Sequence, residues 1–537
     1  MRRIAMYRNV MRKISCLTWI MAIAGTLPLG AQMPGFYEDD PIEKWPQPGN
    51  VESVNPRKLS DYYDFFYHLF GKPGDAPSQD HPIRAEGVNT LGEVPDSEWY
   101  TNRHYRYPMT VDELQRGAGD GNTPDTRGIL TVIGAKTQGV TPGFSIKDST
   151  GRRYLVKFDP VSNPEMATAA DIISSKFLYA LGYNVPEYYL ISFNRGQLTV
   201  DPDATVTDAQ GRKRHMTERD VTDLLLDVPR NADGSYRAIA SLFLEGDNVG
   251  EFRFFGTRSD DPNDTVMHER RRDLRGYRIF CAWLNHDDSR AVNTLDMLVE
   301  NNGVRYIKHF LIDFGSTLGS ATSRPNSPRS GNEYLFSWKP PLAQLATLGF
   351  YVPRWARADF PDLPSVGRFE WEVFDPETWV PEYYNPAFAN CLPEDAFWAA
   401  KQVMAFSDEQ IRAVVQTGEY SDPVAEAWIA TCLIHRRDKI VEVRNEHLDF
   451  EDLETRYAFV PEREYSFEWF LYENKTGQIT PVNPSRNPTI PQSFLDASPG
   501  EYFGVFIRCA DSDKTVAVYF RKEADGLKVV GIDRMPE

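Results

Sequence analysis

The stretch NHDDSRAVNTLDM, residues 285–297, contains two neighbouring aspartates, an arginine and an asparagine directly after a segment rich in aromatic and apolar residues. A polar turn between two elements would have this composition, because Asp and Asn side chains hydrogen-bond readily to nearby backbone. A loop that carries out phosphoryl transfer would have it too. That chemistry needs an oxygen base and an oxygen ligand for a divalent metal close together.

Upstream of this stretch the sequence predicts a strand-rich region. β-Branched residues cluster in three short runs that are separated by Gly-rich connections and a DSTG turn. The three runs are 129–133, 144–146 and 154–158. A helix is expected within 163–182, because Pro164 suits a first helical turn and Gly182 can end it. A last strand is expected to end at Glu245, after which the chain should turn helical.

Four residues supply the groups that phosphoryl transfer needs. Lys157 is a cation at the end of an apolar strand. Asp288 and Asn293 are five residues apart, so one side chain can face an acceptor hydroxyl while the other faces a metal. Downstream, residues 294–313 predict a hairpin. Asp313 ends it just before a glycine, which suits a metal-binding carboxylate.

The arrangement resembles the protein-kinase-like superfamily. HDDSRAVN, residues 286–293, is similar to the catalytic loop H-R-D-L-x-x-x-N, and IDFG, residues 312–315, matches the D-F-G motif. The chain looks closest to the HipA-type and phosphoinositide-kinase-like atypical kinases, through LGYNVPEYYLI (181–191) and WLNHDDSRAVN (283–293). The resemblance implies an α+β, bilobal protein-kinase-like fold with a strand-rich N-lobe and a helical C-lobe. It also implies ATP and Mg²⁺ as cofactors.

The resemblance also implies roles for individual residues. Asp288 would be the catalytic base, and Arg290 would reach the transferred phosphate. Asn293 and Asp313 would bind Mg²⁺, and Lys157 would bind the nucleotide phosphates.

Other expected nucleotide contacts are less defined. The carboxylate that pairs with Lys157 could be Asp171, which fits the HipA-type register, or Glu165, which lies nearer the helix start. Glu245, where the last strand is expected to end, is a further candidate for nucleotide binding. Three glycines could form the phosphate loop, although their spacing departs from G-x-G-x-x-G. They are Gly134, Gly139 and Gly143.

The function predicted is a secreted kinase-like phosphotransferase that moves the γ-phosphate of ATP to an acceptor the sequence does not identify. The alternative is a catalytically inactive kinase-fold binding or scaffold protein of the cell envelope. A glycoside hydrolase is a minor alternative, because its paired acids can be recognised only from their geometry. The motifs G-x-S-x-G and G-x-x-x-x-G-K-[ST] do not occur in the sequence.

The chain is expected to divide into five parts. Its start is basic without an acid and continues into an apolar run too short to span a bilayer, as in a secretory signal peptide, which predicts a secreted or periplasmic protein. No span is expected after its removal. The parts are a signal peptide 1–31, a loop-rich N-terminal extension 32–125, an N-lobe 126–245, a helical C-lobe 246–448 and a β-rich C-terminal unit 449–537.

The net charge and the cysteine spacing make two kinds of binding unexpected. The formal net charge is −18, and removal of the five basic residues of 1–31 would make it −23, so nucleic acid is not an expected partner. Four cysteines follow the signal segment without a C-x-x-C spacing, so a zinc ribbon is not expected. They are Cys281, Cys391, Cys432 and Cys509. The sequence is compatible with disulfides between these cysteines and with buried free thiols.

Overall fold

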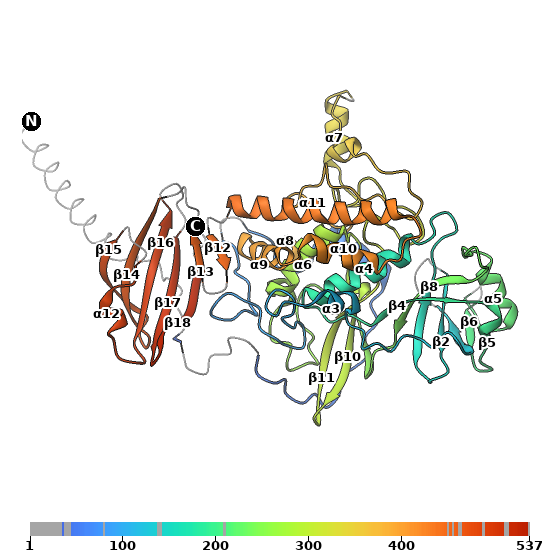
Figure 1. Ribbon diagram of the computed structural model, residues 1–537, viewed down its shortest axis with the longest axis horizontal. Coiled ribbons are helices and arrows are strands. Elements are labelled where there is room, and N and C mark those ends of the chain that lie inside the picture. Colours follow the sequence, from blue (N-terminus) through green and yellow to red (C-terminus); the bar gives the residue numbers. More distant parts are fainter. Residues whose placement is uncertain are drawn as a thin grey trace, which may run out of the picture. The chain divides into compact units, whose positions relative to one another are not determined.

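The computed structural model describes most of the chain after the expected signal segment. It describes residues 35–36, 45–78, 81–136, 142–207, 211–348, 350–447, 450–453, 456–459, 464–485, 489–509 and 515–534. The expected signal peptide and Gly139 lie outside these residues. The chain forms two compact units (Figure 1). The smaller unit combines residues up to 40, 90–92 and the chain from 462 onward, and the larger unit contains 41–89 and 93–461.

A six-stranded sheet forms one end of the larger unit. Its strand order is β4-β8-β3-β2-β1-β5, and only the β1–β5 pair is parallel. The strands are β1 (Leu130–Ala135), β2 (Gly143–Lys147), β3 (Arg153–Lys157), β4 (Tyr188–Phe193), β5 (Leu198–Val200) and β8 (Tyr236–Leu242). A small β6 (Thr205–Thr207) and β7 (Lys213–His215) pair lies beside helix α5 (Glu218–Leu225) in sequence. The three strands expected near 129–158 are therefore present.

Helix α4 (Met166–Ala180) connects this sheet to the helical part. Nearly every one of its side chains is buried. Its first turn is capped by Asp159, whose Oδ1 accepts the backbone N–H groups of Ala167 and Thr168 at 2.7 and 2.8 Å. A carboxylate at a helix N-terminus satisfies amides that have no partner inside the helix. Asp159, two residues beyond the end of β3, therefore holds the start of α4.

A second sheet and a group of helices complete the larger unit. Contrary to the expectation that the chain turns helical after Gly246, strand β9 comes first and pairs with the expected hairpin. Its strands are β9 (Asp247–Gly250), β10 (Thr294–Asn301) and β11 (Val304–Leu311). Helix α6 (Arg272–Leu284), buried on nearly all sides, is surrounded by later helices. The helices α8 (Pro386–Ala389), α9 (Pro393–Met404) and α11 (Pro423–His447) contact α6, and α10 (Asp408–Gln416) contacts α11.

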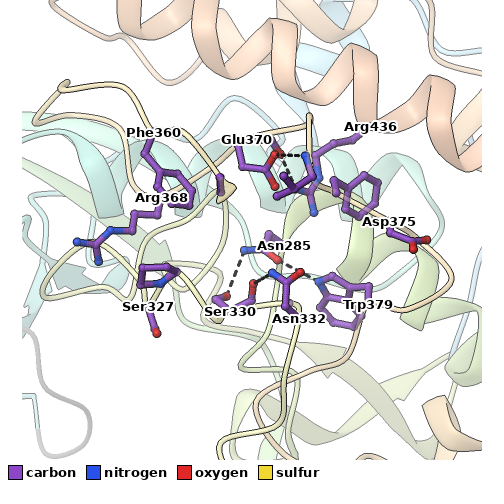
Figure 2. A pocket seen from close by; sticks show the side chains of 15 residues that line it. Asn285, Ser327, Ser330, Asn332, Phe360, Arg368, Glu370, Asp375, Trp379 and Arg436 are labelled. Carbon is purple, nitrogen blue, oxygen red and sulfur yellow. Dashed lines mark hydrogen bonds between the residues drawn. The ribbon is translucent and has the colours of Figure 1, made fainter. Parts of the chain in front are cut away.

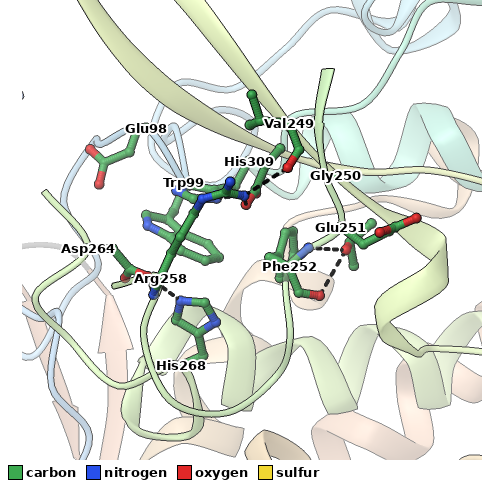
Figure 3. A network of polar contacts seen from close by, with 12 residues as sticks. Glu98, Trp99, Val249, Gly250, Glu251, Phe252, Arg258, Asp264, His268 and His309 are labelled. Atoms are coloured by element: carbon green, nitrogen blue, oxygen red, sulfur yellow. Dashed lines mark hydrogen bonds and ion pairs between the residues drawn. The ribbon is translucent and has the colours of Figure 1, made fainter. Parts of the chain in front are cut away.

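The N-terminal extension packs against the β9–β10–β11 sheet. Its described residues form the short helices α2 (Asp61–Phe66) and α3 (Val111–Arg116) and the π-helical turn Tyr67–Gly71. Its Trp99 stacks on His309 with ring centroids 3.5 Å apart. Figure 3 shows the surrounding polar network, in which His268 pairs with Asp264 at 2.8 Å. Asp296 is fully buried there and is paired by His309, Arg258 and Arg57 of the extension at 2.7, 3.0 and 3.3 Å. Such a buried acid needs all its partners.

A close backbone approach fixes the extension to β9. Gly250 has a φ of +101°, and a Cβ built there would lie 1.8 Å from the carbonyl oxygen of Arg57. We expect Gly250→Ala to lower the free energy of unfolding by about 2–3 kcal/mol, since strain and a backbone clash add. Gly151→Ala is the matched control, because Gly151 has a φ of +89° with no atom within 4 Å of the added Cβ. Equal losses in urea unfolding of the two variants would contradict the clash.

The smaller unit is β-rich, as expected for the end of the chain. Its five-stranded antiparallel sheet has the order β15-β14-β16-β17-β18. The strands are β14 (Tyr465–Glu473), β15 (Gln478–Ser485), β16 (Tyr502–Cys509), β17 (Thr515–Glu523) and β18 (Gly526–Arg534), with helix α12 (Gln492–Leu495). Phe36 lies in its core with 1% of its surface exposed. The short pair β12 (Phe450–Leu453) and β13 (Arg456–Phe459) belongs to the larger unit.

Two sequence questions are answered for the described residues. Cys281, Cys391 and Cys432 carry free thiols, and the first and last of them are buried. In the described part of the chain, no helix combines the length and the apolar character that crossing a bilayer requires.

Candidate functional site

Lys157 lies between two carboxylates that are far away in the sequence. Its Nζ is 2.7 Å from Oδ2 of Asp171 on α4 and 2.9 Å from Oδ1 of Asp313, which follows β11. The side chains of Lys157 and Asp171 are 6% and 2% exposed, whereas that of Asp313 is 39% exposed. The end of a strand, a buried helix and the end of a hairpin therefore meet at one ammonium group, with Asp313 facing solvent.

The backbone around Asp313 is held in an unusual conformation. Asp313 has a φ of +61°, in the left-handed region that few residues other than glycine adopt. Its N–H donates to the hydroxyl of Tyr188 at 3.2 Å. The next N–H, that of Phe314, donates to Oδ1 of Asp171 at 2.8 Å. Gly315 allows this approach, because a Cβ there would lie 3.3 Å from Asp171. Local strain of this kind is held by surrounding contacts and is common at functional sites.

Lys157 and the two carboxylates shift one another's pKa values. Burial alone would lower the pKa of Lys157, but Asp171 and Asp313 outweigh it and raise the pKa well above its usual value. Burial raises the pKa of Asp171. Burial also acts to raise the pKa of Asp313, but Lys157 and the nearby Lys136 outweigh it, so the net pKa lies below the usual value. Lys157 is therefore cationic at neutral pH, and Asp313 is the ionised, accessible carboxylate.

Polar side chains in the loop of residues 285–293 hold one another in place. The amide nitrogen of Asn293 donates to the backbone oxygen and Oδ2 of Asp288 at 2.7 and 3.0 Å. Asp288 forms an ion pair with Arg290 through its other oxygen. The guanidinium of Arg290 lies over the ring of Tyr383, 5.1 Å from its centroid. Asp288 and Asn293 are thus neighbours, as their spacing suggested.

Asn293 and Asp313 fit the requirements of a hard cation. The N–H of Ile312 donates to the backbone oxygen of Asn293 at 3.0 Å, which places the start of β10 beside the residue before Asp313. Since Asp288 accepts from the amide nitrogen of Asn293, the amide oxygen is the atom left to bind a cation. A carboxylate and an amide oxygen suit Mg²⁺, which keeps several waters or phosphate oxygens as its other ligands.

Asp287 occupies the position where the kinase motif has arginine. Its carboxylate accepts hydrogen bonds from Ser330 Oγ at 2.6 Å and Asn326 Nδ2 at 3.0 Å. Its backbone oxygen accepts the N–H of Glu382 at 2.9 Å. Burial, together with the charges of Asp288 and Glu382, raises the pKa of Asp287 to about 7. Asp287 therefore anchors the polar segment around residues 326–330 to the loop.

This raised pKa predicts a pH dependence of stability. The folded-state pKa of Asp287 lies above that of the unfolded chain, so between about pH 4 and 7 the folded state binds more protons and stability falls as pH rises. We expect Asp287→Asn to remove a stability change of about 2–4 kcal/mol across this pH window. Urea unfolding of both proteins from pH 4.5 to 8 measures the difference. Parallel stability curves would show that Asp287 does not titrate in this window.

Several expected nucleotide contacts are not part of the cluster. Asp171, and not Glu165, pairs with Lys157; Glu165 instead accepts the N–H of Ser421 at 2.9 Å. Glu245 is exposed beyond the end of β8 and makes no contact with the cluster among the described side chains. Sequence spacing could not decide between Asp171 and Glu165, because both lie near the start of one helix.

The glycines have different roles. A Cβ at Gly143 would lie 2.5 Å from the carbonyl oxygen of Val156, so the β2–β3 pairing next to Lys157 requires glycine there. At Gly134 the nearest atom would be 3.7 Å away, and nothing around it requires glycine. The β1–β2 connection, where Gly139 is located, lies mostly outside the described residues.

Two residues of the site carried no sequence signal. Lys136 follows β1, and burial and the nearby charge of Lys157 lower its pKa. Tyr188 on β4 is buried beside Asp313, and burial raises the pKa of its hydroxyl. Both are ordinary residues in strand-forming stretches, and only the three-dimensional fold places them at the cluster.

A pocket near Asn285 has a structural explanation (Figure 2). Asn285 accepts from Trp379 Nε1 at 3.0 Å and donates to Ser330 Oγ at 3.2 Å. The buried guanidinium of Arg436 donates to the backbone oxygens of Trp283, Glu370 and Ala282. Because the polar groups of Asn285 and Arg436 have hydrogen-bond partners within the protein, we interpret the pocket as a structural feature that supports the loop starting at Asn285.

No protein-family model matches the chain, and no curated protein matches it. Similar solved structures include the proinflammatory kinase CtkA of Helicobacter pylori, at 12% identity and a TM-score of 0.31 over 57% of this chain and 93% of that one. Hydra Fam20, solved with sugar, has 10% identity and a TM-score of 0.31 over 64% and 97%. The Golgi casein kinase with Mn/ADP bound has 13% identity and a TM-score of 0.28 over 74% and 96%. These values are too low to assign a family.

Proposed function

We propose that this chain is a kinase-like phosphotransferase that uses ATP and a divalent metal ion. One observation carries the proposal, namely that the buried Lys157 and Asp171 and the solvent-facing Asp313 form a single ion cluster. A lysine held by a helix carboxylate and a metal-binding aspartate is the arrangement that orients nucleotide phosphates in kinase-like enzymes. The mixed sheet and helix architecture around the cluster is consistent with a bilobal kinase-like fold. The HipA-type or phosphoinositide-kinase-like branch is proposed from the sequence motifs alone.

Each residue has a proposed task. Lys157 donates to nucleotide phosphate oxygens, and Asp171 keeps its ammonium charged and directed toward Asp313. Asp313 and Asn293 bind the metal, which neutralises phosphate charge. Asp288 accepts the proton of the acceptor hydroxyl, and Arg290 balances negative charge beside it. The acceptor would approach from the Arg290 side, where Ser289, Tyr383 and residues of the extension line a small pocket.

The proposal is tested by metal-dependent nucleotide binding. We expect ATP to bind more tightly with Mg²⁺ than with a chelator, and Asp313→Asn to remove on the order of 10-fold or more of that gain, since a charged metal ligand is lost. Asp247→Asn, at an aspartate whose side chain is 78% exposed on β9, is the matched control and should behave like the parent. Calorimetry with and without Mg²⁺ gives the affinities.

The outcomes separate the candidate functions. ATP binding together with phosphate transfer to water or protein supports the phosphotransferase. Metal-dependent ATP binding without any transfer would favour the inactive kinase-fold binding protein. Absence of ATP binding by the parent chain would overturn the proposal.

A further inference from the structure

A short helix of the larger unit carries an unusual set of exposed apolar side chains. Helix α7 (Lys339–Ala346) stands apart from the other helices of its unit in Figure 1. Leu342, Leu345 and Leu348 are 60, 73 and 88% exposed. Trp338 before the helix and Phe350 after it are 74 and 88% exposed. We call residues 335–352 the α7 protrusion. Large apolar side chains gathered in this way on a soluble surface usually mark an interaction site.

The base of the protrusion is tied to the body of the unit. Trp355 donates from Nε1 to Glu333 at 2.5 Å. Arg354 forms an ion pair with Asp375 at 2.6 Å. The conformation is thus anchored on the C-terminal side, and the apolar side chains lie beyond the anchors. An exposed loop lacking such contacts would have no fixed apolar surface to present.

Backbone groups at the C-terminal end of α7 form hydrogen bonds within the segment. The hydroxyl of Thr347 donates to the carbonyl oxygen of Ala343 at 2.8 Å and accepts the N–H of Tyr351 at 2.9 Å. The N–H of Thr347 donates to the same carbonyl at 3.0 Å. Backbone groups that enter an apolar phase must find partners inside the chain, because no water is available there. The last turn of this helix therefore meets that requirement.

Local charge identifies the kind of surface. Acidic residues make up 77 of the 537 residues, so 25 residues would contain about 3–4 of them on average, yet 334–358 contains none. The same stretch has three basic residues, namely Lys339, Arg354 and Arg357. Arg354 is paired to Asp375 and the side chain of Arg357 is exposed, so this stretch adds positive charge beside the apolar side chains. Basic residues beside Trp, Phe and Leu are the composition of segments that lie in a membrane interface.

An adjoining segment extends the apolar surface. Phe65 of α2 contacts Phe336 with ring centroids 6.1 Å apart. Next to it, Tyr62, Phe66 and Phe70 are 81, 53 and 77% exposed. Two apolar segments that are far apart in the sequence thus meet at the base of the protrusion, which enlarges the area available for one partner.

From these observations we infer that the α7 protrusion inserts into the interface of an anionic lipid bilayer. The leucines and aromatic residues would enter the boundary between headgroups and acyl chains, and Arg357 would face the lipid headgroups. The α7 protrusion is convex, and a convex apolar surface fits a deformable lipid interface better than a rigid protein surface. The inference concerns attachment to a surface and is independent of the proposed phosphotransferase activity.

The test follows hydrogen exchange of the protrusion itself, so that binding through other segments of the chain does not interfere. The full chain is mixed with vesicles of phosphatidylcholine containing about one third phosphatidylglycerol, or with phosphatidylcholine alone. We expect amide exchange in residues 342–352 to slow several-fold with the anionic vesicles and much less with the neutral ones. Each basic residue near an anionic surface contributes about fivefold in affinity, and added salt should weaken the effect.

Three variants define the contact. Leu345→Ser/Phe350→Ser should abolish the slowing, because apolar insertion is lost. Arg357→Glu should weaken vesicle affinity by on the order of 10-fold, since a favourable charge becomes repulsive. Leu226→Ser is the matched control, with a leucine that is 75% exposed outside the protrusion, and it should behave like the parent. Equal melting temperatures of all three show that folding is unaffected.

Two outcomes overturn the inference. The first is exchange in the protrusion that is the same with and without anionic vesicles. The second is slowing that appears without vesicles as protein concentration rises and disappears in Leu345→Ser/Phe350→Ser, because the occupant is then a second copy of the chain. A loss of slowing confined to the two protrusion variants supports lipid contact.

Discussion

Asp288→Asn is expected to lower phosphoryl transfer by on the order of 10²-fold or more while nucleotide affinity stays near that of the parent. Asparagine can still accept the hydrogen bond from the amide of Asn293, so the loop keeps its shape. It cannot accept a proton from a hydroxyl, and it no longer neutralises Arg290. The loss should therefore appear in turnover and hardly at all in the melting temperature.

Asp287→Asn provides the matched control for this variant. It removes a carboxylate one position earlier, and that carboxylate is buried against Ser330 and Asn326. Single-turnover transfer and ATP affinity should be measured for both variants at one pH. Asp287→Asn should keep transfer within a few-fold of the parent. If Asp288→Asn transfers phosphate as fast as the parent, Asp288 is a turn residue and not a base.

Lys157→Met is expected to have the largest effect on stability and on nucleotide binding together. Removal of the ammonium leaves Asp171 buried beside Asp313 without a cation. Breaking such a buried pair costs about 3 kcal/mol or more. The same change removes the cation that the nucleotide phosphates would contact, so ATP affinity should fall on the order of 10-fold or more.

A double variant separates the two effects of Lys157→Met. In Lys157→Met/Asp171→Asn the buried charge is gone, while an oxygen remains to accept the N–H of Phe314. We expect urea unfolding to show that most of the lost stability returns. ATP binding should not return, because no cation is restored. Recovery of both properties would mean that Lys157 acts only through folding, and recovery of neither would mean that the Lys157–Asp171 pair is not the source of the instability.

The sequence could predict those site residues that follow a local pattern. Lys157 and Asp313 each end an apolar strand, and the structure brings them together at 2.9 Å. The start of α5 also follows a local pattern, since Thr217 and Asp220 form a capping box. Hydrophobic runs and caps are local signals, and they locate elements reliably enough to rank the charged residues at their ends.

The remaining contacts depend on distance in space. Asp159 caps α4, and Tyr188 supports Asp313, but neither position differs in pattern from its neighbours. Strand β9 follows Glu245 although its four residues lack an alternating apolar pattern, because pairing with β10 supplies its stability. Helix α7 is short and has two prolines in its first turn, so it gives no periodic signal in the sequence.

Because the extension packs on the β9–β10–β11 sheet, it can fold into place only after that sheet has been synthesised. The hydrogen bond from the N–H of Arg305 to Asn50 joins residues 255 positions apart. Ribosomes add about 5–20 residues per second, so the extension waits on the order of 10–50 seconds for its docking surface to be made. During that interval Trp99 and Arg57 lack the partners that later bury them. The extension thus reaches its native place only after β11 has been synthesised, and until then its apolar side chains need protection from other contacts.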